Sequence, residues 1–411
     1  MGKAGLLAPA ADDGALAGSE INAFAFDLLR QLDPTGNLCA SPTSVALALA
    51  MVRPGARGLT ATQMDQVLHD FGTTGQASEI VALIKTLQSQ TFYDDSNGLP
   101  PDPSASPSQA GQQPVVELDV SNAVFSQQGM SLEQAYLDAL SSGFGAGVGL
   151  VDYANYPEAA RQIINAWASE RTKGRIPEVL QPGDITNATR IALANAIYLK
   201  AGWTNPFDPK ATKTLPFTRS DGSRVSVPTM AMDHQLSYSA GTGYRAVELP
   251  YGGAYGTLSM MIVVPDNMTS FVNGLTTAEL AGIVSGARAY DVDLTLPKFS
   301  VDSRADLADA LKAMGMTALF DPDSADLSGI TTDETLFIAK VIHEANIDVV
   351  EEGTTASAVT VASGEATAAG PGPTPPHVQL HVDKPFLYFI RETTTGAILF
   401  MGRVDDPSAA S

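Results

Sequence analysis

The chain lacks, or has few of, several residue types and motifs that usually indicate a function. Cys39 is the single cysteine among 411 residues, which excludes an intramolecular disulfide. No GxSxG, HExxH or CxxC pattern occurs, so the common signatures of α/β-hydrolases, zinc proteases and thiol redox centres are missing. No apolar run approaches the ~20 residues of a membrane-spanning helix. With 24 basic against 45 acidic residues, the formal charge of −21 disfavours nucleic acid and anionic membranes as partners.

Residues that could carry chemistry have simpler explanations. Cys39 lacks a nearby base in the sequence, which favours an inert buried thiol. His377 and His381 have the spacing of a helical metal pair, but two prolines precede them and the residues between them alternate as in a strand. No metal site, cofactor or catalytic constellation is therefore expected, and the chain is predicted not to be an enzyme.

What the chain does have is enough apolar sequence, 44% of residues, to bury a large core. Helical spacing predicts helices at 19–32, 43–52, 60–68, 79–90, 131–140, 157–171 and 307–314. Runs rich in β-branched and aromatic residues predict strands at 115–125, 191–199, 247–251, 258–265, 292–299, 337–350, 385–390 and 397–404. Helices and strands are interleaved without strict alternation, so the predicted class is α+β.

The predicted organisation is one domain with a variable surface. Residues 1–18 are expected to be a flexible N-terminus, 19–407 the domain and 408–411 a tail. Segment 94–113, rich in Pro, Ser, Gly and Asp, is predicted to be a disordered surface insertion. The N-terminus is a poor signal peptide, and nothing in composition assigns a compartment.

Segment 351–376 is the most unusual stretch. It begins with two acids and a glycine, continues with small or β-branched residues, and ends in a proline-broken run. Such composition is equally typical of a flexible linker. However, long β-type runs flank it on both sides, and a mobile segment between core strands of one domain is more often a functional loop than a spacer.

Sequence motifs around this segment show a family resemblance. Glu351-Glu-Gly-Thr-Thr-Ala-Ser-Ala-Val-Thr360, followed by Lys384-Pro-Phe and Leu399-Phe-Met-Gly-Arg, resembles the reactive-loop region of serpins. Ser121-Asn-Ala-Val-Phe and Thr172-Lys-Gly-Arg-Ile also match, and matches run in family order over nearly the whole chain. The resemblance implies three β-sheets, about nine helices, an exposed reactive loop over 351–376, and an extracellular location, with a cytoplasmic location left open as the alternative.

The resemblance also implies a mechanism. A serine protease cleaves the exposed loop as a substrate and forms an acyl-enzyme, and the cleaved loop then inserts into the main sheet before deacylation. Insertion needs small, uncharged inward residues. The corresponding hinge positions are Glu351, Gly353, Thr354, Ala356, Ala358 and Thr360. Many relatives have an acid at the position of Thr355, which is expected to face outward and to matter little.

Two polar clusters are implied by the same resemblance. The shutter, where the sheet opens, corresponds to Ser41, Ser44, Asn195 and His343. These residues also suit a satisfied buried network, and both descriptions can hold together because separating the strands breaks such a network. The breach, where the loop enters, corresponds to Trp203, Lys298 and Glu351, with an ion pair between the last two. The helix at 157–171 resembles the one that lies across the sheet and must give way during insertion.

The reactive bond follows from counting along the loop. Counting seventeen positions from Glu351 in the family manner gives Thr367–Ala368, whereas counting back from Lys384 gives a site near Thr374. The forward count is preferred, because the sheet sets the length of the inserted strand. No Lys or Arg occurs between Gly353 and Asp383, so the expected partner is a serine protease with a small specificity pocket, elastase-like or subtilisin-like, with a glutamate-specific protease as a minor option.

An alternative remains open at this point: a non-inhibitory serpin-fold carrier or chaperone. Such relatives tend to have charged, bulky or proline residues in the hinge, and none occurs in 353–362. The chain is expected to act as a monomer. Helix 79–90 offers only Lys85 as a basic residue, so no heparin-type cofactor is expected.

Overall fold

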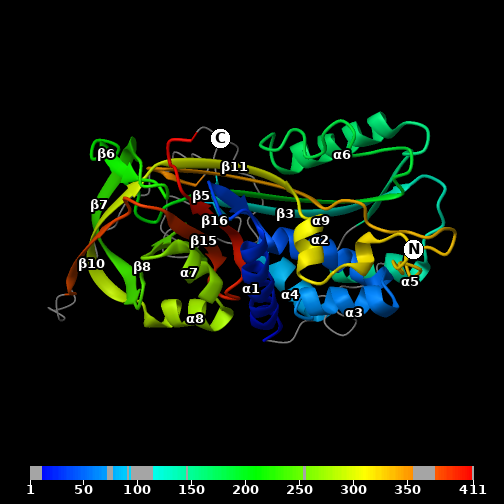
Figure 1. Ribbon diagram of the computed structural model, residues 1–411, viewed down its shortest axis with the longest axis horizontal. Coiled ribbons are helices and arrows are strands. Elements are labelled where there is room, and N and C mark those ends of the chain that lie inside the picture. The colour runs from blue at the N-terminus through cyan, green and yellow to red at the C-terminus, as the bar shows by residue number, and fades with distance from the viewer. Residues whose placement is uncertain are drawn as a thin grey trace.

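The computed structural model describes residues 12–71, 77–89, 92–93, 114–144, 147–252, 256–354 and 375–409. Within them, nine α-helices pack around two hydrogen-bonded networks of strands (Figure 1). The helices are α1 (Asp13–Gln31), α2 (Pro42–Val52), α3 (Gly58–Val67), α4 (Ala77–Gln88), α5 (Gln134–Ala139), α6 (Pro157–Arg171), α7 (Met268–Gly274), α8 (Thr277–Gly286) and α9 (Ala308–Ala313). None of these described helices is long and apolar enough to cross a membrane.

The smaller network has seven strands in the order β11-β12-β13-β5-β3-β2, with β4 also paired to β3. Its members are β2 (Phe92–Tyr93), β3 (Pro114–Gln127), β4 (Val148–Val151), β5 (Ile191–Gly202), β11 (Phe299–Asp306), β12 (Ile342–Val350) and β13 (Gly353–Thr354). In Figure 1, α6 lies on one side of the long strands β3, β5 and β11, and α1 to α4 lie on the other. One face of this sheet is therefore covered by a single long helix.

The larger network has nine strands in the order β1-β16-β15-β9-β8-β7-β10-β14, with β6 also paired to β7. Its members are β1 (Leu38–Ala40), β6 (Lys213–Thr218), β7 (Arg224–Gly241), β8 (Tyr244–Pro250), β9 (Leu258–Pro265), β10 (Arg288–Pro297), β14 (His377–His381), β15 (Phe386–Glu392) and β16 (Ile398–Val404). The 18-residue β7 pairs with β6 through its first part and with β8 through its last, and so joins two halves. With these halves counted separately, the predicted α+β fold of three sheets and about nine helices is confirmed.

The core lies between the sheets and the N-terminal helices. All eleven residues of α2 are buried, since this helix passes through the interior and needs no polar face. Every residue of β9, β15 and β16 is likewise buried. Strands buried on both faces read as continuous apolar runs, which explains why these segments are visible in the sequence.

Several predicted boundaries differ from the structure, among them the start of the predicted strand 337–350, because β12 begins at Ile342. Helix α1 begins at Asp13 and not near Ser19, so residues 13–18 of the expected flexible N-terminus are helical; Ala17 and Gly18 are buried, and Gly18 packs against the backbone of Thr395. The predicted strand 292–299 is in fact divided between two sheets. Pro297 ends β10. Lys298 donates its backbone N–H to the Pro228 carbonyl (2.9 Å), and β11 begins at the next residue.

Candidate functional site

Two of the predicted hinge residues of segment 351–376 form a strand. Gly353 and Thr354 make up β13, which pairs with β12 on one side (Thr354 with Val349) and with β5 on the other (Thr354 with Ala201). Among the strand pairs of the described residues, β12 and β5 are connected only through β13. The segment therefore enters the smaller sheet at the seam between these two strands.

Gly353 is required at this entrance because the backbones approach closely. A Cβ atom on Gly353 would lie 2.1 Å from the carbonyl oxygen of Ala201 and 2.8 Å from the Cα of Gly202. Both contacts are with backbone atoms, which cannot rotate away as a side chain can. The sequence predicts a glycine chosen for freedom at a hinge; the structure shows a glycine that also allows two strands to pack closely.

Two stacked aromatic side chains, Trp203 and Tyr251, pack beside the entrance. Trp203, 1% exposed, stacks on Tyr251 with ring centroids 4.4 Å apart and planes 11° apart. Its indole Nε1 donates to the Val350 carbonyl (3.0 Å), and its backbone N–H donates to the Glu352 carbonyl (3.0 Å). The hydroxyl of Tyr251 is hydrogen-bonded to the hydroxyl of Thr354. The turn before β13 is thus bonded to a rigid aromatic platform.

Glu351 is the buried acid of this turn. One carboxylate oxygen lies 2.7 Å from the Nζ of Lys298, and the other accepts a hydrogen bond from the Thr212 hydroxyl (2.8 Å). The Glu351 side chain is 8% exposed and that of Lys298 is 35% exposed. Burial alone would raise the pKa of Glu351, but the bonds from Lys298 and Thr212 outweigh burial and leave this pKa below its ordinary value. The ion pair expected from the sequence is present and is only partly exposed.

Three of the four residues assigned to the predicted shutter, Ser41, Ser44 and His343, come together where β12 passes the start of α2. The backbone N–H of Ser41 donates to Nε2 of His343 (2.9 Å), and the Ser41 hydroxyl caps α2 by accepting from the Ser44 N–H (3.2 Å). All three residues are buried. Burial lowers the pKa of His343 to about 4, so its ring is neutral and able to accept at neutral pH. Asn195 belongs to β5, but its side chain is outside the described part of the structure.

The other predicted site residues lie partly inside and partly outside the described part of the chain. The hinge residues Ala356, Ala358 and Thr360 and the reactive bond Thr367–Ala368 lie outside the described residues. Cys39 is buried, as predicted, and burial raises the pKa of its thiol to about 12. His377 and His381 are exposed and lie on β14, the predicted strand. No group of three or more metal-type side chains occurs among the residues that the structure describes.

Sequence reasoning missed three parts of the entrance. Tyr251 was visible only as the end of an apolar strand, and Thr212 lies in a segment with no local signal. The cations of the Thr172-Lys-Gly-Arg-Ile motif were used to recognise the family and assigned no contact. Tyr251 is hydrogen-bonded to Thr354, and Thr212 to Glu351; Lys173 contacts Glu117, and Arg175 contacts Asp348. Every one of these partners lies more than 50 positions away in the sequence, so no local pattern could have paired them.

Comparison with known proteins agrees with this fold. Residues 19–407 match the family model "Serpin (serine protease inhibitor)". The chain is 33% identical over 396 residues to the leukocyte elastase inhibitor of Xenopus tropicalis, covering 93% of this chain and 97% of that protein. It is 33% identical over 399 residues to human serpin B3, covering 95% and 99%. The native structure of the thermophilic serpin tengpin superposes with a TM-score of 0.81 at 23% identity, covering 98% of this chain and 97% of that one.

This chain belongs to the serpin family, the family described as serine protease inhibitors. The family assignment agrees with the expectation from the sequence motifs. A protease is thereby the partner that the family and its elastase-inhibitor relatives support.

Proposed function

We propose that this chain is an irreversible suicide-substrate inhibitor of serine proteases with small specificity pockets. The observation that carries the proposal is the position of β13, which lies as a strand between β12 and β5 at the entrance to the sheet. A loop that continues from Thr354 along this seam adds one strand to the sheet. The bonds of each added residue to both neighbours supply the free energy that drives insertion.

The residues that follow Thr354 fit this role by their side chains. The register of β13 makes the Thr354 side chain point inward, as its burial shows, so Ala356, Ala358 and Thr360 follow on the inward face. All are small and uncharged, and they fill an interior position without burying an unpaired charge. At ~3.3 Å per residue, the segment from Thr354 to Thr367 spans roughly 45 Å, which is sufficient to cross a large sheet.

The chemistry of the inhibited state belongs to the protease. Its serine attacks the carbonyl carbon of Thr367, the peptide bond to Ala368 breaks, and the new amino terminus leaves with the C-terminal fragment. Hydrolysis of the ester would complete ordinary turnover. Insertion of the cleaved loop moves the attached protease away from its starting position and so competes with that hydrolysis. Inhibition is the outcome when insertion is faster.

The test is incubation with an elastase-like protease and, separately, with a subtilisin-like protease. The expected product is a complex that survives boiling in SDS, together with loss of protease activity at a ratio near one to one. Cleavage of the chain by both proteases at their small-residue sites without any such complex would show that the chain is a substrate and not an inhibitor. A thermal melt of the cleaved chain is the matching control, because only an inserted loop raises the midpoint strongly.

A further inference from the structure

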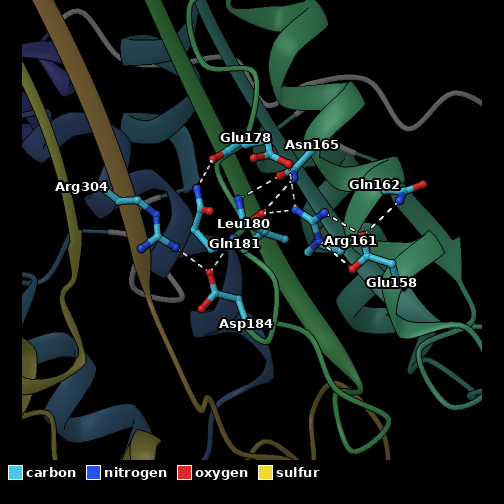
Figure 2. Close-up of polar contacts among 9 residues, drawn as sticks. All are labelled: Glu158, Arg161, Gln162, Asn165, Glu178, Leu180, Gln181, Asp184 and Arg304. Carbon is cyan, nitrogen blue, oxygen red and sulfur yellow. Dashed lines mark hydrogen bonds and ion pairs between the residues drawn. The ribbon is translucent and has the colours of Figure 1, made fainter.

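The segment that follows α6 forms a strap over the seam. We define the strap as residues 172–184, which lead from α6 toward β5. The strap is bonded to α6 through two side chains that Figure 2 shows pointing at it. Arg161 donates to the Leu180 carbonyl (2.7 Å) and contacts Glu178 (3.2 Å), and Asn165 exchanges two hydrogen bonds with the Leu180 backbone (2.9 and 2.8 Å). These bonds therefore fix the strap to α6.

Ion pairs attach the strap to strands on both sides of the seam. Lys173 pairs with Glu117 of β3 and lies over the ring of Tyr198, with Nζ 5.8 Å from its centroid. Arg175 pairs with Asp348 of β12 at 2.8 Å. Further along, Asp184 pairs with Arg304 of β11 (2.5 Å), which Figure 2 also shows, and with Lys340 (2.7 Å).

The strand register places the first two pairs in one row of the sheet. Thr354 lies opposite Ala201 and Val349, and the next row toward the interior contains Lys200 on β5 and Asp348 on β12. Glu117 lies directly opposite Lys200 on β3. The carboxylates of Glu117 and Asp348 thus belong to the row that residue 355 joins when the strand is extended by one residue.

The backbone of the strap brings its two cations to this row. Lys173 and Gly174 both have left-handed φ angles, 53° and 81°, so the chain turns sharply at the end of α6. This turn sends Lys173 toward β3 and Arg175 toward β12. A left-handed lysine is an uncommon conformation, and the buried bonds of Thr172 to Ala168 and Ile176 hold the turn on both sides.

We propose that Lys173 and Arg175 are positioning residues of the inhibitory reaction. Together they clasp β3 to β12 over the row beyond Thr354, and they determine how fast the seam admits an incoming strand. This inference rests on the proposed function, in which that strand is the cleaved loop. The clasp delays entry of the loop before cleavage, which preserves the active inhibitor, and its release is one of the steps that limit trapping of the protease.

The rate of strand entry can be measured without any protease. A synthetic peptide with the sequence of residues 355–366 is mixed with the uncleaved chain, and its annealing is followed by native electrophoresis and by the fluorescence of the two tryptophans, Trp167 on α6 and Trp203 at the entrance. The variants are Lys173→Met, Arg175→Met and the double variant. Arg171→Met removes an exposed cation from the last turn of α6 and serves as the matched control.

Neutralising either cation is expected to speed annealing about fivefold, as suits a partly exposed ion pair, and the double variant should be faster still. Added salt should speed the wild-type chain more than the double variant, because screening acts on the Lys173 and Arg175 pairs, whereas the double variant keeps the Asp184 pairs of the strap. Lys173→Arg should keep the slow rate. A second double variant, Arg175→Glu with Asp348→Arg, reverses the charges of this ion pair and should restore the slow annealing rate. A role of these residues in folding alone would not restore that rate.

Equal annealing rates for wild type, double variant and control, with the same salt response, would overturn the clasp. If the double variant does not fold, the two single variants decide the matter through the same comparison of annealing rate and salt response with the wild-type chain. The two proposals fail separately. If the wild-type chain traps elastase but the strap variants anneal at the wild-type rate, the proposed function stands and the proposed clasp is wrong. If the wild-type chain traps no protease but the strap variants anneal faster, the proposed clasp stands and the proposed function is wrong.

Discussion

The imidazole of His343 accepts a hydrogen bond from the backbone N–H of Ser41, at 2.9 Å, and so joins strand β12 to the first residue before α2. Strand β12 is one of the two strands that border the seam at which β13 enters. Any movement that widens the seam from this side must break or carry along this bond. The protonation state of His343 is therefore linked to how firmly the sheet is closed.

Acid should weaken the closed sheet through His343. Its pKa is lowered from 6.5 to about 4 by burial, so below pH 6.5 the unfolded chain binds a proton that the folded chain does not. Stability from this source is constant above pH 6.5 and falls as the pH decreases toward 4, by up to about 3 kcal/mol in total. Urea unfolding of wild type and His343→Gln between pH 4 and 8 measures the difference. The glutamine variant should lose this part of the acid sensitivity; parallel curves would contradict it.

Removing the cation beside Glu351 should destabilise the entrance. Lys298→Met leaves a carboxylate that is 8% exposed with Thr212 as its remaining side-chain donor. Because the lysine is partly exposed, the expected loss is about 1 kcal/mol at pH 7. The lowered pKa of Glu351 means that this contribution is present above the ordinary glutamate pKa and disappears in acid. Urea unfolding at pH 7 and at pH 3 tests both statements, with Lys210→Met, an exposed lysine, as the control.

A methyl group at the hinge glycine should convert inhibition into turnover. Gly353→Ala places a Cβ against the Ala201 carbonyl, so β13 must move away from β5. A barrier to insertion higher by about 1.4 kcal/mol favours hydrolysis of the acyl-enzyme about tenfold. The measured quantity is the number of inhibitor molecules consumed per protease inactivated. Gly282→Ala, on α8 with no atom near the added methyl, should leave this number unchanged.

The position of the reactive bond can be decided by two arginine variants. Thr367→Arg supplies the cation that a trypsin-type pocket pairs with, and should create rapid inhibition of trypsin. Thr374→Arg places the same cation at the site given by counting back from Lys384, and should yield cleavage without trapping. Mass spectrometry of the wild-type C-terminal fragment is the direct check. A start at Ala368, give or take one or two residues, agrees, whereas a start beyond Pro373 refutes the forward count.

Sulfated polysaccharides should leave the inhibition rate unchanged at physiological salt. Helix α4 carries Lys85 as its one basic residue and Glu79 in its first turn, and the whole chain has a formal charge of −21. A polyanion is therefore repelled over most of the surface. Rates of protease inactivation with and without heparin measure this directly. An acceleration that disappears on adding salt would contradict it.

Much of the fold was predictable because its core strands are almost continuously apolar. Strands β9, β15 and β16 are buried along their whole length and read as short hydrophobic runs with strand-type composition. Helix α6 was placed at its observed bounds, since a proline begins it and an amphipathic pattern follows. Strands β6 and β7 were not predicted. Their exposed and buried residues do not alternate regularly over their full length, so periodicity alone does not identify them.

The sequence by itself determined the fold class, the family and the residue types of the hinge, because these depend on local composition and on motifs in a known order. Only the tertiary structure decided which partners those residues have. Glu351 meets Thr212, Thr354 meets Tyr251, and Lys173 and Arg175 meet carboxylates on β3 and β12. Such pairs form where strand register and a sharp helix-ending turn bring distant segments into one row. No property of a short stretch of sequence encodes that row, because it exists only after the strands have paired.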